Sequence, residues 1–127
     1  MSRKNILSGS PWEDKMGYCR AVRINNIIEV AGTVAMVDGD LVKADDAFAQ
    51  TQNIIERIAI VLKDAGAGLE DVIRTRIFTT DISLFDDIAR AHGQYFGEIK
   101  PTTGIYEISK LVSPDFLVEI EFTAVLQ

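Results

Sequence analysis

The sequence predicts an α+β fold in which two helices cover one face of a mixed β-sheet. Residues 45–65 carry apolar side chains at helical spacing, and residues 83–97 show a shorter pattern of the same kind. Runs rich in β-branched residues flank and separate these two segments. The resulting order is strand, hairpin, helix, strand, helix, strand, strand. Such an order favours one sheet with both helices on the same side.

Length and composition indicate one globular domain, residues 1–127. The net charge of −6 argues against a nucleic-acid partner, because nucleic-acid binding normally needs a clustered basic surface. Cys19 is the only cysteine, so no internal disulfide is possible and a reducing compartment is favoured. No apolar run reaches membrane-spanning length, and the N-terminus lacks a secretory pattern. We therefore expect a cytoplasmic protein without a membrane partner.

The N-terminal third predicts a short strand, a loop and a hairpin. Residues 8–17 are rich in Ser, Gly, Pro and charge and predict the loop, from which we expect Trp12 to pack against a helix rather than to cover a cleft. Residues 21–24 and 27–31 flank Asn25-Asn26, a good hairpin turn because Asn tolerates positive φ. Gly32 is expected to end the second strand, and Asp38-Gly39 predicts another turn.

Two helices are predicted from the apolar spacing. The first spans residues 45–65 and presents one face made of Phe48, Thr51, Ile54, Ile55, Ile58, Val61, Leu62 and Ala65. Asp45 and Asp46 suit its positive end, and Gly66 suits its C-terminal cap. The second runs from Ser83 to about Gly97 and ends before Pro101. Its expected buried residues are Phe85, Ile88, Ala89, His92 and Phe96.

Two strands carry charge on one side. If residues 72–79 neighbour the last strand, Arg74 and Arg76 meet Glu119 and Glu121 as cross-strand ion pairs. We interpret this face as a wet subunit interface, with solvated surface pairs as the alternative. Val72 and Phe78 would share the arginine side. The residues expected to pack under the helices are Ile73, Thr75, Ile77, Val118, Ile120 and Phe122.

Few residue types suited to metal or nucleophilic chemistry are present. His92 is the only histidine, which excludes a multi-histidine metal site within one chain, and we expect it to be a hydrogen-bonded packing residue. Cys19 is expected to be buried on the opposite strand face from Tyr18, and no nearby histidine activates its thiol. Neither a metal nor a cofactor is predicted.

Several motifs, taken in order, resemble the RidA/YjgF family, also labelled endoribonuclease L-PSP. Gly17–Val22 followed by Ile28–Thr33 resembles its first hairpin, and Gln52–Gly66 resembles its first helix. Asp71–Asp81 is similar to its fourth strand. Pro101-Thr102-Thr103-Gly104, Ile105–Leu111 and Leu117–Phe122 are similar to its C-terminal end. The chain is identified as a divergent member of that family.

The resemblance implies a chorismate-mutase-like fold and a homotrimer with its sheets packed inside. It also implies three clefts between subunits. Many members hydrolyse reactive imines or enamines to 2-oxo acids and ammonia without a metal or cofactor. By the same resemblance, the catalytic residues here are Tyr18, which lines the cleft, and Glu107, which positions water. Gly32, Thr33 and Thr103 would bind substrate.

Three positions depart from the family pattern. Ala31 replaces a serine, Ala89 replaces an asparagine, and Thr103 replaces the arginine that grips the substrate carboxylate. A threonine offers only one neutral donor, so efficient deamination of 2-iminopropanoate is not expected. Arg20, two residues after Tyr18 and on the same strand face, is our candidate replacement. The alternatives for Arg20 are a solvated strand arginine or an interface salt bridge.

Three functional interpretations stay open. The leading one is a trimer that binds a small anionic metabolite in an intersubunit cleft and hydrolyses an imine or enamine there. The second is a ligand-binding or interaction trimer without catalysis. The third, an endoribonuclease, is the weakest because the chain is acidic and has a single histidine. The expected partners are therefore a small molecule and further copies of the chain.

Overall fold

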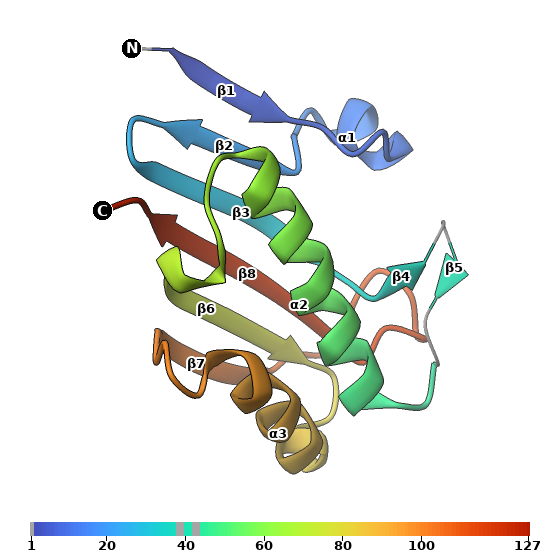
Figure 1. Ribbon diagram of the computed structural model, residues 1–127. Coiled ribbons are helices and arrows are strands. Elements are labelled where there is room, and N and C mark those ends of the chain that lie inside the picture. Colours follow the sequence, from blue (N-terminus) through green and yellow to red (C-terminus); the bar gives the residue numbers. More distant parts are fainter. Residues whose placement is uncertain (1, 38–39, 42–43) are drawn as a thin grey trace.

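In the computed structural model, which describes residues 2–37, 40–41 and 44–127, one mixed sheet carries both long helices on the same face (Figure 1). The sheet has six strands in the order β1-β2-β3-β8-β6-β7, and β4 and β5 form a separate ribbon. This confirms the predicted fold class. The strands are β1 (Arg3–Ile6), β2 (Ala21–Ile24), β3 (Ile27–Thr33), β4 (Met36–Val37), β5 (Asp40–Leu41), β6 (Val72–Thr79), β7 (Thr102–Glu107) and β8 (Val118–Val125). The helices are α1 (Pro11–Met16), α2 (Ala47–Asp64) and α3 (Phe85–Phe96).

The segment predicted as a loop contains helix α1. Ser10 caps this helix by accepting a hydrogen bond from Trp12 N at 3.3 Å, Pro11 occupies the first turn, and Gly17 ends the helix at φ 76°. The prediction was wrong because a Ser-Pro pair that suggests a break also makes a good helix start. Trp12 is 48% exposed, and the Lys15 ammonium lies 5.4 Å from the centre of its ring.

The predicted hairpin and its turn are confirmed. Asn25 adopts φ 56°, and β2 pairs with β3 in antiparallel register, with Ala21 opposite Val30. Strand β3 continues one residue beyond Gly32, and its pairing with β8 is irregular between Val30 and Thr33. The expected turn at residues 38 and 39 lies outside the described residues.

Helix α2 is confirmed and packs its predicted face on the sheet. Asp46 caps it by accepting from Ala49 N at 2.9 Å, and Gly66 follows it at φ 88°. Helix α2 also carries a buried polar residue that was not predicted, Gln50. Gln50 donates to Asp115 O at 3.1 Å and accepts from Leu117 N at 3.0 Å. It therefore ties the connection between β7 and β8 to the helix.

Helix α3 is confirmed, but its buried face is rotated from the prediction. Phe85 is 46% exposed and Ala89 is exposed, whereas Ala91 is buried beside the predicted Ile88 and Phe96. The difference arises because residues 82–84 form a 3₁₀ turn, so the α-helical phase starts only at Phe85. His92 lies 3.0 Å from the Thr75 hydroxyl and packs against the Phe96 ring, which confirms that it is a hydrogen-bonded packing residue.

Strands β6 and β8 are neighbours, which was the condition for the expected ion pairs, and they run antiparallel with Arg76 opposite Glu121. A bulge between Val72 and Arg74 puts the side chains at the start of β6 on the opposite faces of the sheet from those predicted. Val72 is buried at 3% exposure and Ile73 is 46% exposed. The predicted cross-strand ion pairs do not form in the single chain. Among the described residues, the ion pair within 4 Å is Arg90–Asp87.

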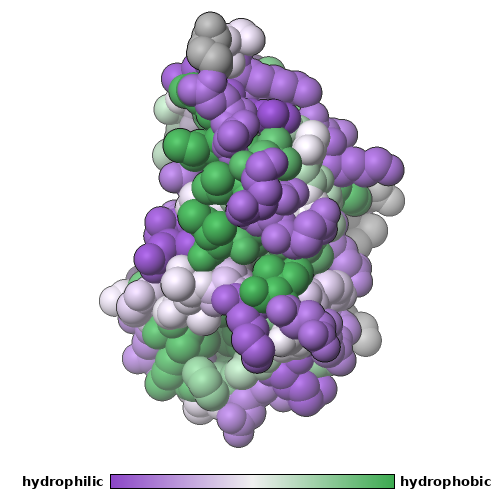
Figure 2. All heavy atoms as spheres, turned by 60° about the vertical axis from the view of Figure 1, so that its left-hand side comes forward, coloured by the Kyte–Doolittle hydropathy of each residue, from purple (hydrophilic) through white to green (hydrophobic). Residues whose placement is uncertain are grey.

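The sheet face away from α2 and α3, here called the open face, lacks a covering helix within the described chain. The exposed side chains of Ile24, Ile27 and Ile73 lie at one end of strands β2, β3 and β6. Figure 2 turns this end of the molecule forward and shows hydrophobic side chains in a band between hydrophilic ones. None of the described helices is long and apolar enough to cross a membrane.

Candidate functional site

The predicted site residues fall into two groups within one chain. Tyr18, Arg20, Gly32 and Thr33 lie at or just before strands β2 and β3, whereas Thr103 and Glu107 lie on the edge strand β7. Strands β8 and β6 separate β3 from β7 in the sheet order. At the usual spacing of neighbouring strands, β3 and β7 are about 14 Å apart. A single chain therefore does not bring the two groups together.

Tyr18 lines a hollow on the open face, with a cavity volume of about 580 Å³. Ala31, Arg76 and Glu121 contribute to the same hollow. Cys19 lines it as well and is only half-buried, so the prediction that Cys19 is buried away from Tyr18 was wrong. Residues 17–20 are not in a strand, and the strict alternation of sides therefore does not apply to them.

Arg20 is buried rather than solvated, with 8% of its surface exposed. One terminal nitrogen, Nη2, donates to Gly32 O at 2.7 Å, and the guanidinium carbon lies 5.7 Å from the centre of the Tyr18 ring. Its Nε is buried and has no hydrogen-bond partner. Arg20 thus lies beside Tyr18 and Gly32. The sequence led us to expect Arg20 and Tyr18 in one cleft, but in the single chain they line different cavities.

Glu119 is the site residue that sequence reasoning missed. Its carboxylate lies so close to Gly32 that a side chain at residue 32 would collide with it. Burial raises the pKa of Glu119, the Arg20 charge opposes that rise, and the Glu121 charge adds to it. The sequence signal was available in the alternation of Glu119 and Glu121. The irregular β3–β8 pairing that sets Glu119 beside Gly32 was not predicted.

The second group forms a hydrogen-bonded chain at the sheet edge. Thr75 donates to the Thr103 hydroxyl at 2.6 Å, and the same Thr75 oxygen lies 3.0 Å from His92 Nε2. Burial lowers the pKa of His92, which favours its neutral form. Glu107 is exposed and accepts from Ile82 N at 2.9 Å. In one chain, Glu107 therefore caps the 3₁₀ turn before α3.

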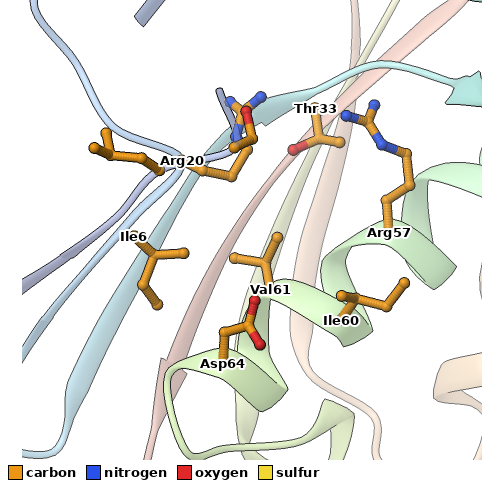
Figure 3. Close-up of a pocket in the computed structure, with 9 residues that line it drawn as sticks. Ile6, Arg20, Thr33, Arg57, Ile60, Val61 and Asp64 are labelled. Atoms are coloured by element: carbon orange, nitrogen blue, oxygen red, sulfur yellow. The ribbon is translucent and has the colours of Figure 1, made fainter. Parts of the chain in front are cut away.

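A further pocket lies between the end of β1 and helix α2, with a cavity volume of about 260 Å³. Figure 3 shows Arg20, Thr33 and Arg57 gathered on one side of it. Thr33 is buried and donates to Ala31 O at 2.9 Å, and Arg57 donates to Val34 O. Burial lowers the pKa of Arg57, and the neighbouring Arg20 charge lowers it further. Within the described ranges, no cluster of three His, Cys, Asp or Glu side chains could hold a metal ion.

Comparisons with known proteins agree on one family. Residues 12–126 match the family model described as Endoribonuclease L-PSP. A RutC family protein of Pyrococcus abyssi is 36% identical over 109 residues, which cover 84% of each chain. The 3-aminoacrylate deaminase RutC of Acinetobacter baylyi is 34% identical over 108 residues, covering 84% of this chain and 85% of that one.

Solved structures agree with the sequence matches. The crystal structure of a member of the YjgF/YER057c/UK114 family from Mycobacterium tuberculosis superposes with a TM-score of 0.90 and 45% identity. The superposition covers 98% of this chain and 100% of that one. The matched region includes the hairpin with Tyr18 and Gly32 and both strands that carry Thr103 and Glu119. This chain therefore belongs to the RidA/YjgF family, the family that the Endoribonuclease L-PSP model describes.

Proposed function

We propose that this protein forms a homotrimer, binds a small anionic metabolite in a cleft between two subunits, and hydrolyses an imine or enamine there. The observation that carries the proposal is the separation of the two residue groups in one chain. Tyr18, Gly32 and Glu119 lie at one part of the sheet, and Thr103 and Glu107 lie at its far edge. A neighbouring copy that packs on the open face supplies the second group to the first.

The reaction needs a water, a base for its proton and a route for that proton to the leaving nitrogen. Glu119 fits the base because burial raises the pKa of its carboxyl, which favours proton uptake. Water adds to the carbon of the protonated imine while Glu119 takes one proton from the water, which leaves a neutral carbinolamine. Glu119 then gives that proton to the nitrogen, and the C–N bond breaks as the carbinolamine hydroxyl gives its own proton to Glu119. The proton left on Glu119 is the one that protonated the imine. The imine and water thereby give a carbonyl compound and ammonia. Glu107 remains the alternative base from the sequence prediction.

Arg20 supplies the positive charge that attracts the anion. It is buried beside Tyr18, and its Nη2 donates to the Gly32 carbonyl. Thr103 contributes only a hydroxyl. A hydrogen bond from a neutral hydroxyl to a carboxylate is weaker and less directional than a bidentate contact from an arginine. The site therefore favours a substrate other than 2-iminopropanoate, and 3-aminoacrylate is the first to test, because a relative is named for it.

The test is ammonia release from 2-iminopropanoate and 3-aminoacrylate, each generated in the assay. We expect turnover of 3-aminoacrylate by the wild type. Glu119→Gln should lower kcat by about 10²–10⁴-fold because it removes the general base. Glu107→Gln should have a much smaller effect. The reverse ranking would assign the base to Glu107 and overturn the assignment of Glu119.

Arg20→Ala separates the anion anchor from the base, because it should raise KM more than it lowers kcat. An unchanged KM would contradict the role of Arg20 as the anion anchor. If the folded wild type releases no ammonia from either substrate but binds 2-oxo acids, the protein is a ligand-binding trimer without catalysis. Binding of single-stranded RNA at low salt would favour the endoribonuclease interpretation, which the net charge of −6 disfavours.

A further inference from the structure

The pocket between β1 and α2 has a cationic side and an apolar side (Figure 3). Arg20, Thr33 and Arg57 lie together on one side. The other side is formed by Ile6, Ile60, Val61 and, beyond them, Asp64. Since α2 contributes four of the lining residues, this pocket is on the helix side of the sheet and is separate from the hollow that Tyr18 lines.

Among the residues that the structure describes, neither Arg20 nor Arg57 forms an ion pair within 4 Å. The Arg20 charge acts on the Glu119 carboxylate beside Gly32, and no such interaction is found for Arg57 within the same residues. Arg20 is buried, and its Nε has no partner. Each guanidinium donates to a backbone carbonyl, Gly32 O for Arg20 and Val34 O for Arg57. These carbonyls do not neutralise two neighbouring positive charges. An anion between the guanidinium groups would accept hydrogen bonds from their terminal N–H groups and relieve their repulsion.

We propose that this pocket binds a small aliphatic monocarboxylic acid, with its carboxylate between Arg20 and Arg57 and its tail on Ile6, Ile60 and Val61. The cavity volume of about 260 Å³ is below the range of drug-sized sites and suits a short tail. Asp64 at the apolar side opposes a second negative charge, which selects against dicarboxylates. The site is additional to the proposed cleft, and Arg57 and Ile60 belong to it alone.

The direct measurement is a titration of isoleucine-methyl-labelled protein with 3-methylbutanoate, followed by NMR. We expect saturable shifts of the Ile6 and Ile60 methyl signals. The alcohol 3-methylbutan-1-ol has the same tail without the charge, and it should produce no saturable shift at the same concentrations. Equal binding of acid and alcohol, or no saturable shift at millimolar acid, would show that the pocket does not recognise a carboxylate.

Two exposed-position variants test the charge without disturbing the core. Ile60 is 64% exposed, so Ile60→Asp and Ile60→Asn place side chains of equal shape at the pocket mouth. Ile60→Asp should bind the acid about tenfold more weakly than Ile60→Asn, because the new carboxylate repels the ligand. Arg57→Gln should also lose about tenfold, whereas Lys63→Gln on the same helix should lose nothing.

Ammonia release and the methyl shifts, measured on the same variants, distinguish ligand binding in this pocket from catalysis in the proposed cleft. Both Ile60 variants should release ammonia from 3-aminoacrylate at the wild-type rate, and Glu119→Gln should keep the Ile6 and Ile60 methyl shifts. Equal affinities of Ile60→Asp and Ile60→Asn would contradict the proposal even if the enzyme is active. Methyl shifts that saturate in an inactive protein would support the pocket while contradicting catalysis.

Discussion

Thr103 stands on β7 where the resemblance to the family leads us to expect an arginine. Its hydroxyl accepts a hydrogen bond from Thr75, which in turn contacts His92, so the position is fixed to the core of the chain. In the proposed cleft, Thr103 would offer the substrate a neutral contact where the resemblance to the family predicts a cation.

Thr103→Arg should restore a charged contact to the substrate carboxylate. Hydrogen bonds to charged groups contribute roughly 1.5–3 kcal/mol, so kcat/KM for 2-iminopropanoate should rise by about 10–100-fold. Thr103→Lys is the matched control, because it adds the charge without the two-pronged geometry and should gain less. The measurement is ammonia release under identical conditions. No gain from the arginine variant would mean that residue 103 does not face the substrate.

Glu119 should make stability depend on pH in a defined direction. Because burial raises the pKa of this carboxyl, the folded state holds the proton more tightly than the unfolded state. Its stabilising contribution is therefore present below the unfolded pKa and is lost as pH rises through the folded pKa. Glu119→Gln removes this dependence, so its free energy of unfolding relative to wild type should increase from about pH 4 to pH 7.

Urea unfolding at a fixed protein concentration measures this difference. Glu98→Gln, at an exposed position after α3, is the control and should show no comparable trend. A relative stability of Glu119→Gln that falls with rising pH would contradict the burial of the Glu119 carboxylate.

At the scale of elements, the β2–β3 hairpin, α2, β6 and β8 could be predicted because each has a local signal. The Asn25-Asn26 turn, the apolar face of α2 and the alternation in β8 are examples of such signals. Helix α1 was missed because it has only six residues and its start resembles a break. The bulge in β6 was missed because it depends on the pairing with β8. The buried face of α3 was missed because the chain enters this helix from a 3₁₀ turn.

Gln50 joins two elements that the sequence does not connect. Its side chain holds both Asp115 O and Leu117 N, so Gln50→Met should remove two hydrogen bonds to the connection between β7 and β8. The expected loss is about 1–3 kcal/mol of the free energy of unfolding, from two hydrogen bonds. Gln52→Met, which loses a bond from the same helix to exposed Gln94, should cost much less. Similar losses for both variants would contradict the role of Gln50.

At the scale of the whole molecule, one chain holds the predicted site residues in two separate groups. The sequence and the resemblance named Tyr18, Arg20, Gly32, Thr33, Thr103 and Glu107. The structure brings Tyr18, Arg20 and Gly32 together and adds Glu119 to them. It leaves Thr103 and Glu107 at the far edge of the sheet. The alternation in β8 places Glu119 on one face of its strand, but sequence could not place it beside Gly32, because that contact depends on the register of two strands distant in the chain.

The mass in solution tests the assembly that the cleft needs. One chain is 14.0 kDa, so three copies should sediment at about 42 kDa. The exposed Ile24, Ile27 and Ile73 beside the open face are consistent with burial in such an assembly. A species that stays at 14.0 kDa at micromolar concentrations would contradict the intersubunit cleft.

The most direct test of the account is subunit complementation. Glu119→Gln disables the first residue group, and Thr103→Asp disables the second by placing a negative charge where the substrate carboxylate is expected. When equal amounts of the two variants are unfolded together and refolded, each cleft has about one chance in four of pairing an intact Glu119 with an intact Thr103. Each variant alone should be inactive. The mixture should recover about a quarter of the wild-type ammonia release from 3-aminoacrylate. A mixture as inactive as its two components, beside an active wild type, would contradict a site shared between subunits.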